Sequence, residues 1–380
     1  MSRVAPQRVL LVGVSARALA ESAARAGCDV TAIDAYNDLD LQRVARTIAA
    51  PRHDDGRVDA LALARASHHV EADAVSYLSN FENAPDAVAA LARGRTLLGN
   101  RPPVLRRVRD PLVLARALSQ LGLPTPLVRA SAPPPADATG WLLKPRSSGG
   151  GHGIARWTRG MRVPRSAVLQ QRVRGVPGSI VFIADGAQSF PLALTRQLVG
   201  DPEFGAGGFA YCGSILEPHH PVLFAHAIEL ARLVTREFAL RGACGIDFIA
   251  RDSMPYALEV NPRPTASMEL VERSTGCSIW LAHAAGCSRT LHAPPAPAHH
   301  AEGKAVLYAR RAVVLGDTTR WLADPDVRDI PAPGERIARG SPICTIFARG
   351  RTSALCYAAL VRRARARFAE IEGRMHRRSA

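Results

Sequence analysis

CGIDFIARDSMPYALEVNPRPTASMEL, residues 244–270, consists of two runs of alternating apolar and polar residues around a Pro-containing turn. Asp247, Glu259 and Asn261 interrupt these runs where a fully buried strand would carry Val or Leu. In a hairpin centred near Ser253, Asp247 and Glu259 each lie six residues from the centre, so their carboxylates face each other. Asn261 lies two residues beyond Glu259 and therefore on the same face.

Such an oxygen-rich strand face suits a divalent cation. Facing carboxylates repel each other, and a cation or a shared proton offsets this repulsion. Mg²⁺ and Mn²⁺ prefer carboxylate and carbonyl oxygens and keep waters that phosphates can replace. Arg263 follows directly and can meet an anion beside the metal. The alternative is a surface strand pair with solvated acids. Four apolar residues argue against it by marking the opposite face as core: Ile246, Phe248, Leu258 and Val260.

A glycine-rich loop lies between two apolar runs in WLLKPRSSGGGHGIARW, residues 141–157. Its consecutive glycines can arrange backbone N–H groups as a nest for phosphate oxygens, and Lys144 adds a positive charge at its base. The loop lacks the Gly-Lys-Ser/Thr of a Walker loop, and a strand rather than a helix is expected after it. The alternative is a mobile hairpin tip without a ligand.

The chain opens with a strand–helix–strand pattern over residues 8–34, in which we expect Ser15 to cap the helix. The turn GVS is not a full G-x-G-x-x-G, so a dinucleotide site is disfavoured. Residues 72–80 predict another parallel strand. Glu82 and Asn83 follow its carboxyl end, where open α/β sheets contact their ligands.

Helices are expected within residues 110–126, which Asp110 caps, and within residues 224–242. Pro- and Ala-rich linkers are expected at residues 130–140 and 292–303, and strands dominate the remainder up to Asn261. We therefore predict three parts, with a lid at about residues 141–173 inside the second: residues 1–103, 104–291 and 303–380.

The composition is that of a folded globular protein, with 47% hydrophobic and 22% charged residues. No apolar run approaches the roughly 18 residues that a membrane helix needs, and the first residues lack signal-peptide order. Seven scattered cysteines without a CxxC pair favour a reducing compartment. We expect a cytoplasmic protein with no membrane partner, in which Cys212 and Cys244 are small buried side chains.

The net charge is +16, part of it in the arginine-rich tail at residues 361–379. A basic tail can bind nucleic acid or a membrane surface. Apart from Phe368, no aromatic residue that could stack on bases lies among these arginines, so a solvated basic helix and no nucleic-acid partner are expected. The paired histidines, such as His68 and His69, lack metal-ligand spacing and are expected in solvated loops.

The lysine, the Ser/Gly loop, the strand aspartate and the Glu-x-Asn-Pro-Arg signature together resemble the ATP-grasp superfamily. The segments FENAPD, LLGN, TRQLVG, EVNPRPTASMEL and DIPAPGERIARGSPICT are similar to predicted ATP-dependent carboligases related to biotin carboxylase. That group includes tyramine–glutamate ligases of methanofuran biosynthesis and proteins linked to tetrahydromethanopterin. The resemblance implies an α+β ATP-grasp fold with an N-terminal Rossmann-like α/β domain, a glycine-loop lid and a C-terminal strand-rich unit.

The resemblance also implies roles in nucleotide binding. Lys144 would contact the α and β phosphates of ATP. The loop residues would close over the triphosphate: Ser147, Ser148, Gly149, Gly150, Gly151 and Gly153. Three residues of VLQQRV would hold the adenine, with glutamine where glutamate is common in relatives: Gln170, Gln171 and Val173.

For metal and substrate, the resemblance implies two Mg²⁺ (or Mn²⁺) ions held by Asp247, Glu259 and Asn261, with Glu259 bridging. Arg196 would meet phosphate or substrate, and Arg263 would stabilise the acyl phosphate and the tetrahedral intermediate. One departure is Pro111, which stands where many relatives carry the lysine of an Asp-Lys dipeptide. The additional bicarbonate- and biotin-site residues of biotin carboxylase are not found.

We expect an ADP-forming ligase that activates a small carboxylate with ATP and joins it to an amine, with glutamate as a candidate carboxylate. An aromatic amine would need an apolar slot, for which Phe209, Tyr211 and Trp280 are candidates. Ser267 and Glu269 follow the metal signature and are further candidates for substrate contacts. The alternatives are a carboxylase that activates bicarbonate and a non-catalytic nucleotide-binding regulator. The resemblance also allows a homodimer.

Overall fold

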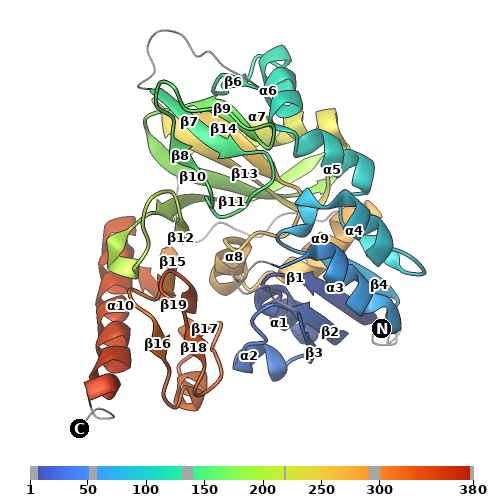
Figure 1. Cartoon of the computed structure of the whole chain (residues 1–380). Coiled ribbons are helices and arrows are strands. Elements are labelled where there is room, and N and C mark those ends of the chain that lie inside the picture. Colours follow the sequence, from blue (N-terminus) through green and yellow to red (C-terminus); the bar gives the residue numbers. More distant parts are fainter. Residues whose placement is uncertain (1–6, 51–57, 131–139, 218–219, 291–299, 377–380) are drawn as a thin grey trace.

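The computed structural model describes residues 7–50, 58–130, 140–217, 220–290 and 300–376 of the chain. The expected linkers at 130–140 and 292–303, and the end of the basic tail, fall largely outside these ranges. Figure 1 shows the described residues as a parallel sheet with helices, a long antiparallel sheet, a small sheet above it and C-terminal strands beside a long helix. No helix in these ranges combines the length and apolar character needed to span a membrane.

The N-terminal sheet is parallel, with strand order β3-β2-β1-β4-β5. Its β1 and β4 are almost entirely buried, as expected for parallel strands covered by helices on both faces. The strands are β1 (Arg8–Gly13), β2 (Asp29–Asp34), β3 (Arg46–Ala49), β4 (Ala74–Tyr77) and β5 (Thr96–Leu98). The helices are α1 (Arg17–Arg25), α2 (Leu39–Gln42), α3 (Ala60–Ala66), α4 (Pro85–Leu91) and α5 (Pro102–Val108).

The prediction that Ser15 caps the first helix is wrong. The N-cap of α1 is Ala16, which offers no side-chain hydrogen bond. The Ala16 N–H instead donates to Asp34 Oδ2 at 2.6 Å, from the end of the neighbouring strand β2. A carboxylate from outside the helix therefore satisfies a free N–H of this terminus, as a local cap otherwise would.

The long sheet is antiparallel, in the order β14-β13-β10-β11-β12-β15-β19-β17. It continues across the predicted boundary between residues 291 and 303, and the predicted division into three parts stays a prediction. The strands are β10 (Val176–Asp185), β11 (Ser189–Val199), β12 (Tyr211–Leu216), β13 (Arg241–Arg251), β14 (Met254–Asn261), β15 (Ala301–Tyr308), β17 (Val327–Arg328) and β19 (Pro342–Gly350). A separate pair joins β16 (Val313–Val314) to β18 (Arg336–Ile337).

The predicted hairpin forms from β13 and β14, and Asp247 pairs directly with Glu259 as expected. Its two-residue turn is Asp252–Ser253, with positive φ at both residues. The turn centre is thus half a residue earlier than predicted. A bulge beyond it, after Asp247, restores the predicted pairing.

The bulge also changes which side chains enter the core. Phe248 pairs with Ala257, and Ala257 is only 2% exposed. The prediction that Leu258 belongs to the core face is wrong, because the extra residue turns Leu258 to the half-buried opposite face. The other three predicted core residues of the hairpin, Ile246, Phe248 and Val260, are buried.

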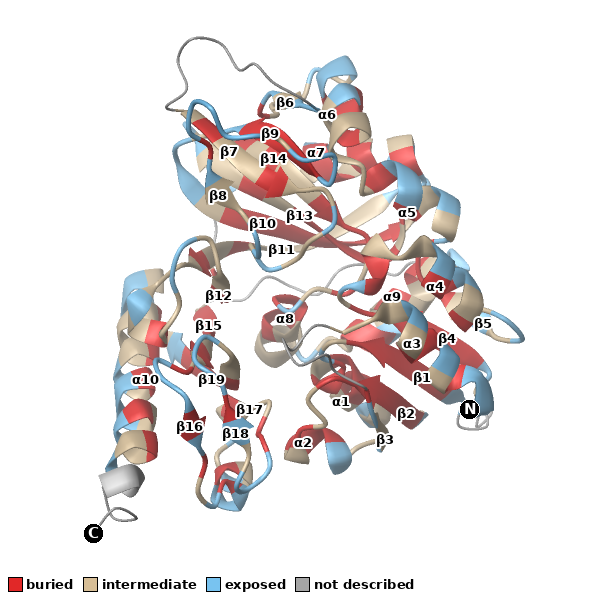
Figure 2. Cartoon of the chain, viewed as in Figure 1, coloured by how far each residue is buried: buried red, intermediate tan, exposed pale blue. Residues whose placement is uncertain are grey.

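Helices cover both faces of the long sheet, and Figure 2 shows β10 as mostly buried and β11 as mostly intermediate. The helices α6 (Pro111–Gln120) and α7 (Pro221–Phe238) share one apolar cluster with β10, β13 and β14. Asp110 caps α6 as predicted, accepting a hydrogen bond from Leu112 N at 2.8 Å. The opposite face meets α8 (Met268–Thr275) and α9 (Ile279–Ser288), and α10 (Ser353–His376) packs on β15 and β19.

The small sheet, at the top of Figure 1, has the strand order β6-β9-β7-β8. Its strands are β6 (Val128–Arg129), β7 (Trp141–Pro145), β8 (Ala155–Arg156) and β9 (Ala167–Gln171). A small core of Trp141, Trp157 and Leu169 holds it together. The predicted lid, residues 141–173, spans three of these strands and the glycine loop between β7 and β8.

Candidate functional site

A cavity of about 770 Å³ is formed jointly by the N-terminal sheet, the small sheet, the long sheet and the C-terminal strands. The metal-ligand candidates and most of the expected nucleotide contacts line it: Lys144, Ser148, Gly149, Gly150, Gly151, Gln170, Gln171, Val173, Asp247, Glu259, Asn261 and Arg263. Ser147 and Gly153 were expected to contact the nucleotide but do not line this cavity. The structure thus brings together residues that lie more than 100 positions apart in the sequence.

Asp247 is held by two amides. Its Oδ1 accepts a hydrogen bond from Gln197 Nε2 at 2.8 Å, and its Oδ2 accepts one from Asn261 Nδ2 at 2.9 Å. Burial, and then the charge of Glu259, raise the pKa of Asp247 to about 6. Without a bound cation, Asp247 therefore titrates close to neutral pH.

Glu259 behaves in the opposite way although it faces Asp247. Its Oε2 lies 3.0 Å from Lys144 Nζ in the small sheet. Burial acts to raise the pKa of Glu259, but the charges of Lys144 and then Arg109 outweigh burial and lower it to about 2. The pair thus has one permanently ionised carboxylate and one that readily takes up a proton.

Arg109 is a site residue that the sequence analysis missed. Its Nε donates to Asn83 Oδ1 at 3.0 Å, and its two terminal nitrogens donate to the carbonyl oxygens of Val260, at 2.9 Å, and Ser148, at 3.0 Å. Arg109 thereby joins the N-terminal sheet, the hairpin and the glycine loop. It lies two residues before Pro111, the position where relatives carry a lysine, and no local pattern separates it from the neighbouring arginines.

Arg263 is oriented by a fully buried acid. Its Nη2 lies 2.8 Å from Glu82 Oε1, and the Glu82 side chain has no exposed surface. Burial opposes the charged form, yet Glu82 raises the pKa of Arg263 above its ordinary value. Glu82 and Asn83, expected near ligand contacts from their place after β4, thus meet Arg263 and Arg109 respectively.

The glycine loop lies against the segment before β12. Gly150 O accepts a hydrogen bond from Tyr211 N at 3.0 Å. Gly151 has a φ of +80°, and a Cβ there would lie 1.8 Å from Phe209 O. This approach and this backbone conformation exclude any larger residue at position 151.

The structure does not bring Arg196 to the cavity. Its Nε pairs with Glu217 Oε1 at 3.3 Å, and its guanidinium lies 5.9 Å from the ring centre of Tyr357. Because side chains alternate along β11, the next residue, Gln197, faces the site and contacts Asp247. The expected phosphate contact thus falls on the wrong face of the strand.

Two of the three aromatic candidates, Phe209 and Tyr211, line the cavity. Trp280 does not, because it is 2% exposed and packs in the core beside His283. Cys244 and Cys212 are buried as expected, and burial raises the pKa of both thiols, that of Cys212 to about 11. In the described part of the chain, neither thiol has the electropositive surroundings of a reactive cysteine.

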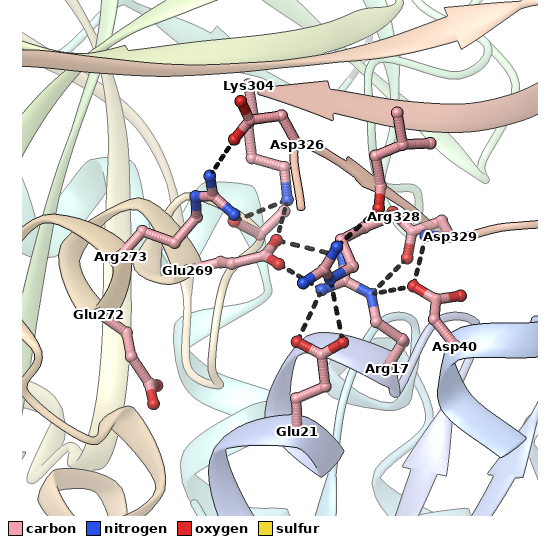
Figure 3. A network of polar contacts seen from close by, with 12 residues as sticks. Arg17, Glu21, Asp40, Glu269, Glu272, Arg273, Lys304, Asp326, Arg328 and Asp329 are labelled. Atoms are coloured by element: carbon pink, nitrogen blue, oxygen red, sulfur yellow. Dashed lines mark hydrogen bonds and ion pairs between the residues drawn. The ribbon is translucent and has the colours of Figure 1, made fainter. Parts of the chain in front are cut away.

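A second polar network, shown in Figure 3, contributes another part of the wall. Glu269 binds Arg17 and also accepts from Lys304 Nζ at 2.6 Å. Arg17 Nε donates to Asp329 Oδ1 at 2.9 Å. Arg17 and Lys304 are 1% and 3% exposed, so the network joins α1, α8, β15 and the segment after β17 in a buried setting. Of these residues, the sequence analysis named only Glu269.

Comparison with known proteins identifies the family of the domain that carries the site. Residues 108–267 match the family model described as the ATP-grasp domain. The chain also superposes on an L-amino acid ligase from Bacillus licheniformis, with 16% identity, a TM-score of 0.70 and coverage of 96% of this chain and 98% of that one. Residues 108–267 therefore carry an ATP-grasp domain, and the predicted resemblance to the ATP-grasp superfamily and the α+β fold are confirmed.

Two further solved structures share the fold. N5-carboxyaminoimidazole ribonucleotide synthetase from Thermus thermophilus is 17% identical, with a TM-score of 0.66 and coverage of 96% and 98% of the two chains. The biotin carboxylase domain of the Hydrogenobacter thermophilus 2-oxoglutarate carboxylase, in complex with MgADP and bicarbonate, is 15% identical, with a TM-score of 0.69 and coverage of 96% and 90%. The prediction that the chain is an ATP-grasp enzyme agrees with these structural neighbours.

Among curated proteins, an uncharacterized protein from Methanocaldococcus jannaschii is 27% identical over 122 residues. The match covers 32% of this chain and 30% of that protein, so this chain spans less than a third of the relative's length. This likeness names no activity.

The carboxylate pair generates a pH prediction. A divalent cation bound by both carboxylates must displace the proton of Asp247, whose pKa is about 6. Mn²⁺ affinity should be constant above about pH 7 and should fall about tenfold per unit below pH 6. Titrations of Mn²⁺ between pH 5 and 8, with Asp247→Asn in parallel to identify weak surface sites, measure this. Equal affinity at pH 5 and 8 would contradict the assignment.

Proposed function

We propose that this chain is an ATP-dependent carboxylate–amine ligase. ATP would phosphorylate a carboxylate, and an amine would attack the acyl phosphate to give an amide, ADP and phosphate. The observation that carries the proposal is the convergence of Asp247, Glu259 and Asn261 with Lys144 and the glycine loop on one cavity of an ATP-grasp fold.

The residues present suit ATP and Mg²⁺. The loop from Ser148 to Gly151 and Lys144 would hold the phosphates, and Gln170, Gln171 and Val173 would border the adenine. Asp247, Glu259 and Asn261 offer oxygen ligands of the kind Mg²⁺ prefers. Bound Mg²⁺ would neutralise phosphate charge during transfer.

The chain's own residues would then serve the reaction as follows. Lys144 now pairs with Glu259, and it would be free to contact the phosphates if Glu259 held the metal. Arg263, fixed by the buried Glu82, stabilises the negative charge of the acyl phosphate and the tetrahedral intermediate. The glycine loop excludes water, which would otherwise hydrolyse the acyl phosphate. Arg109, hydrogen-bonded to Ser148 O, supplies a cation close to the position where Pro111 replaces the lysine.

A more specific proposal names the substrates. Glutamate would provide the carboxylate and an amine such as tyramine the nitrogen, in the biosynthesis of a one-carbon cofactor (methanofuran or tetrahydromethanopterin). Phe209 and Tyr211 in the cavity wall support an aromatic amine.

The bicarbonate bound by one structural neighbour supports a second candidate function, that of a carboxylase. A non-catalytic regulator would retain nucleotide binding without turnover. A cytoplasmic location and a homodimer stay predictions.

Replacement of Glu259 tests the ligase. Glu259→Gln removes the charge that Lys144 and the metal share, so Mg²⁺-dependent ADP release should fall by at least about a hundredfold. Coupled ADP assays on a folded variant measure this. The matched control is Glu229→Gln, on the exposed face of α7, where Glu229 pairs only with Arg232 among the described residues. If Glu259→Gln turned over at a rate near that of the wild type, the assignment of Glu259 as a metal ligand would be wrong.

The glycine loop should gain order when nucleotide binds. Mg·ATP should slow amide exchange in residues 148–151, which line the cavity, because phosphate would accept hydrogen bonds from backbone N–H groups of this loop. Gly151→Ala should abolish this protection, since its Cβ would collide with Phe209 O. Gly207→Ala, where a Cβ meets nothing within 4 Å, is the control. Equal exchange with and without Mg·ATP in the wild type would argue against a phosphate-covering loop.

A substrate screen tests the finer assignment. ADP release with glutamate should depend on an added amine, and tyramine should outperform ammonia because the cavity wall offers aromatic contacts. Bicarbonate-dependent ADP release without an amine would favour the carboxylase instead. If other amino acids or pterin carboxylates support turnover and glutamate supports none, the glutamate assignment fails while the ligase class stands.

A further inference from the structure

The wall formed by the N-terminal sheet, α8 and the C-terminal strands carries more carboxylates than cations. Arg17 and Lys304 are both engaged by Glu269, and Arg17 also by Asp329. Glu272 pairs with Arg25 at 3.0 Å. One lining carboxylate, that of Asp38, has no ion pair among the described residues. The charged side chains of this wall are Arg17, Asp38, Glu269, Glu272, Lys304 and Asp329.

Asp38 is unusual in its hydrogen bonding. It is the N-cap of α2, yet its side chain makes no hydrogen bond to the first turn of that helix. An N-cap aspartate normally accepts such a bond. Asp38 is 4% exposed, and its Oδ2 is buried without a partner in the described part of the chain. A buried acceptor without a donor is costly, and a ligand in the adjoining cavity can supply the donor.

The groups around Asp38 are mostly acidic. Asp34 and Asp40 lie on its own segment, Asp329 follows β17, the thiol of Cys344 lies on β19, and Arg17 on α1 is the cation. Burial, followed by the charges of these three aspartates, raises the pKa of Asp38 well above its ordinary value, against the opposing effect of Arg17. These surroundings disfavour the ionised form of Asp38, and a positive ligand would stabilise that form.

We propose that Asp38 binds a protonated, non-reacting amino group of a substrate. An ammonium group supplies three donors and the positive charge that this wall lacks. A metal ion fits less well, because other carboxylates in and beside this wall are already engaged by Arg17 or Lys304: Asp40, Glu269 and Asp329. The inference rests on the proposed ligase function, and it narrows the substrates to an amino acid, held through its α-amino group, or a diamine.

The test compares ammonium compounds with isosteres by calorimetry: L-glutamate against glutarate, and putrescine against 1,4-butanediol. At least one ammonium compound should bind the wild type about tenfold or more tightly than its isostere, and Asp38→Asn should lose this preference. Asp86→Asn removes an exposed carboxylate of the same domain and should retain it. A preference for glutamate indicates an amino acid, and a preference for putrescine indicates a diamine.

Proton release separates recognition from a structural role. In buffers of different ionisation enthalpy near neutral pH, binding to the wild type should release up to one proton, because Asp38 ionises against the ammonium group. Asp38→Asn should release none while keeping its unfolding temperature, since an amide resembles the protonated acid. Absence of any preference for ammonium in the wild type, or its persistence in Asp38→Asn, overturns the proposal.

Titrations with and without Mg·ADP keep this outcome separate from that of the ligase assignment. Failure of Mg·ADP to bind would count against the ligase while leaving the ammonium measurement valid. Binding of Mg·ADP together with indifference to the amino group would count against the Asp38 site alone.

Discussion

The repulsion between two facing carboxylates constrains the surrounding structure. Asp247 on β13 and Glu259 on β14 face each other across one antiparallel register. Their repulsion is offset because Lys144 from the small sheet neutralises Glu259, while the amides of Gln197 and Asn261 hold Asp247. The pKa of Asp247 is raised to about 6. The small sheet must therefore lie over the hairpin, and the glycine loop that follows β7 is delivered to the same cavity. One electrostatic constraint thus couples the position of the loop to that of the metal-ligand candidates.

The hairpin register could be predicted because the side-chain period of a strand is two and one face must be core. The turn at Asp252–Ser253 and the bulge after Asp247 were each missed, and their effects on pairing cancel. The error shows only at Leu258, which is the extra residue of the bulge and which no periodic pattern predicts. The parallel N-terminal sheet could be predicted equally well from the sequence, since its buried strands form continuous apolar runs.

What could not be predicted depends on tertiary approach. Arg109 and Arg17 are two of many arginines, and nothing in their neighbours distinguishes a buried guanidinium from a solvated one. Arg196 was placed by a motif that fixes position along β11 but not the face, and Gln197 occupies the site instead. Lys304 offered a signal that went unused: it and Lys144 are the chain's only lysines, and both line the cavity.

Both buried networks are internally compensated by the chain's own residues. Lys144 is paired with Glu259, and Arg17 and Lys304 are paired with Glu269, so these strong charges already have partners before a ligand arrives. An unpaired buried charge would cost several kcal/mol, whereas exchanging one partner for another of the same sign costs far less. Ligand binding at these positions is therefore an exchange of ion-pair partners. Asp247 and Asp38 differ from these groups, because neither has an ion pair in the described part of the chain. Burial and neighbouring acids raise the pKa of both carboxyl groups.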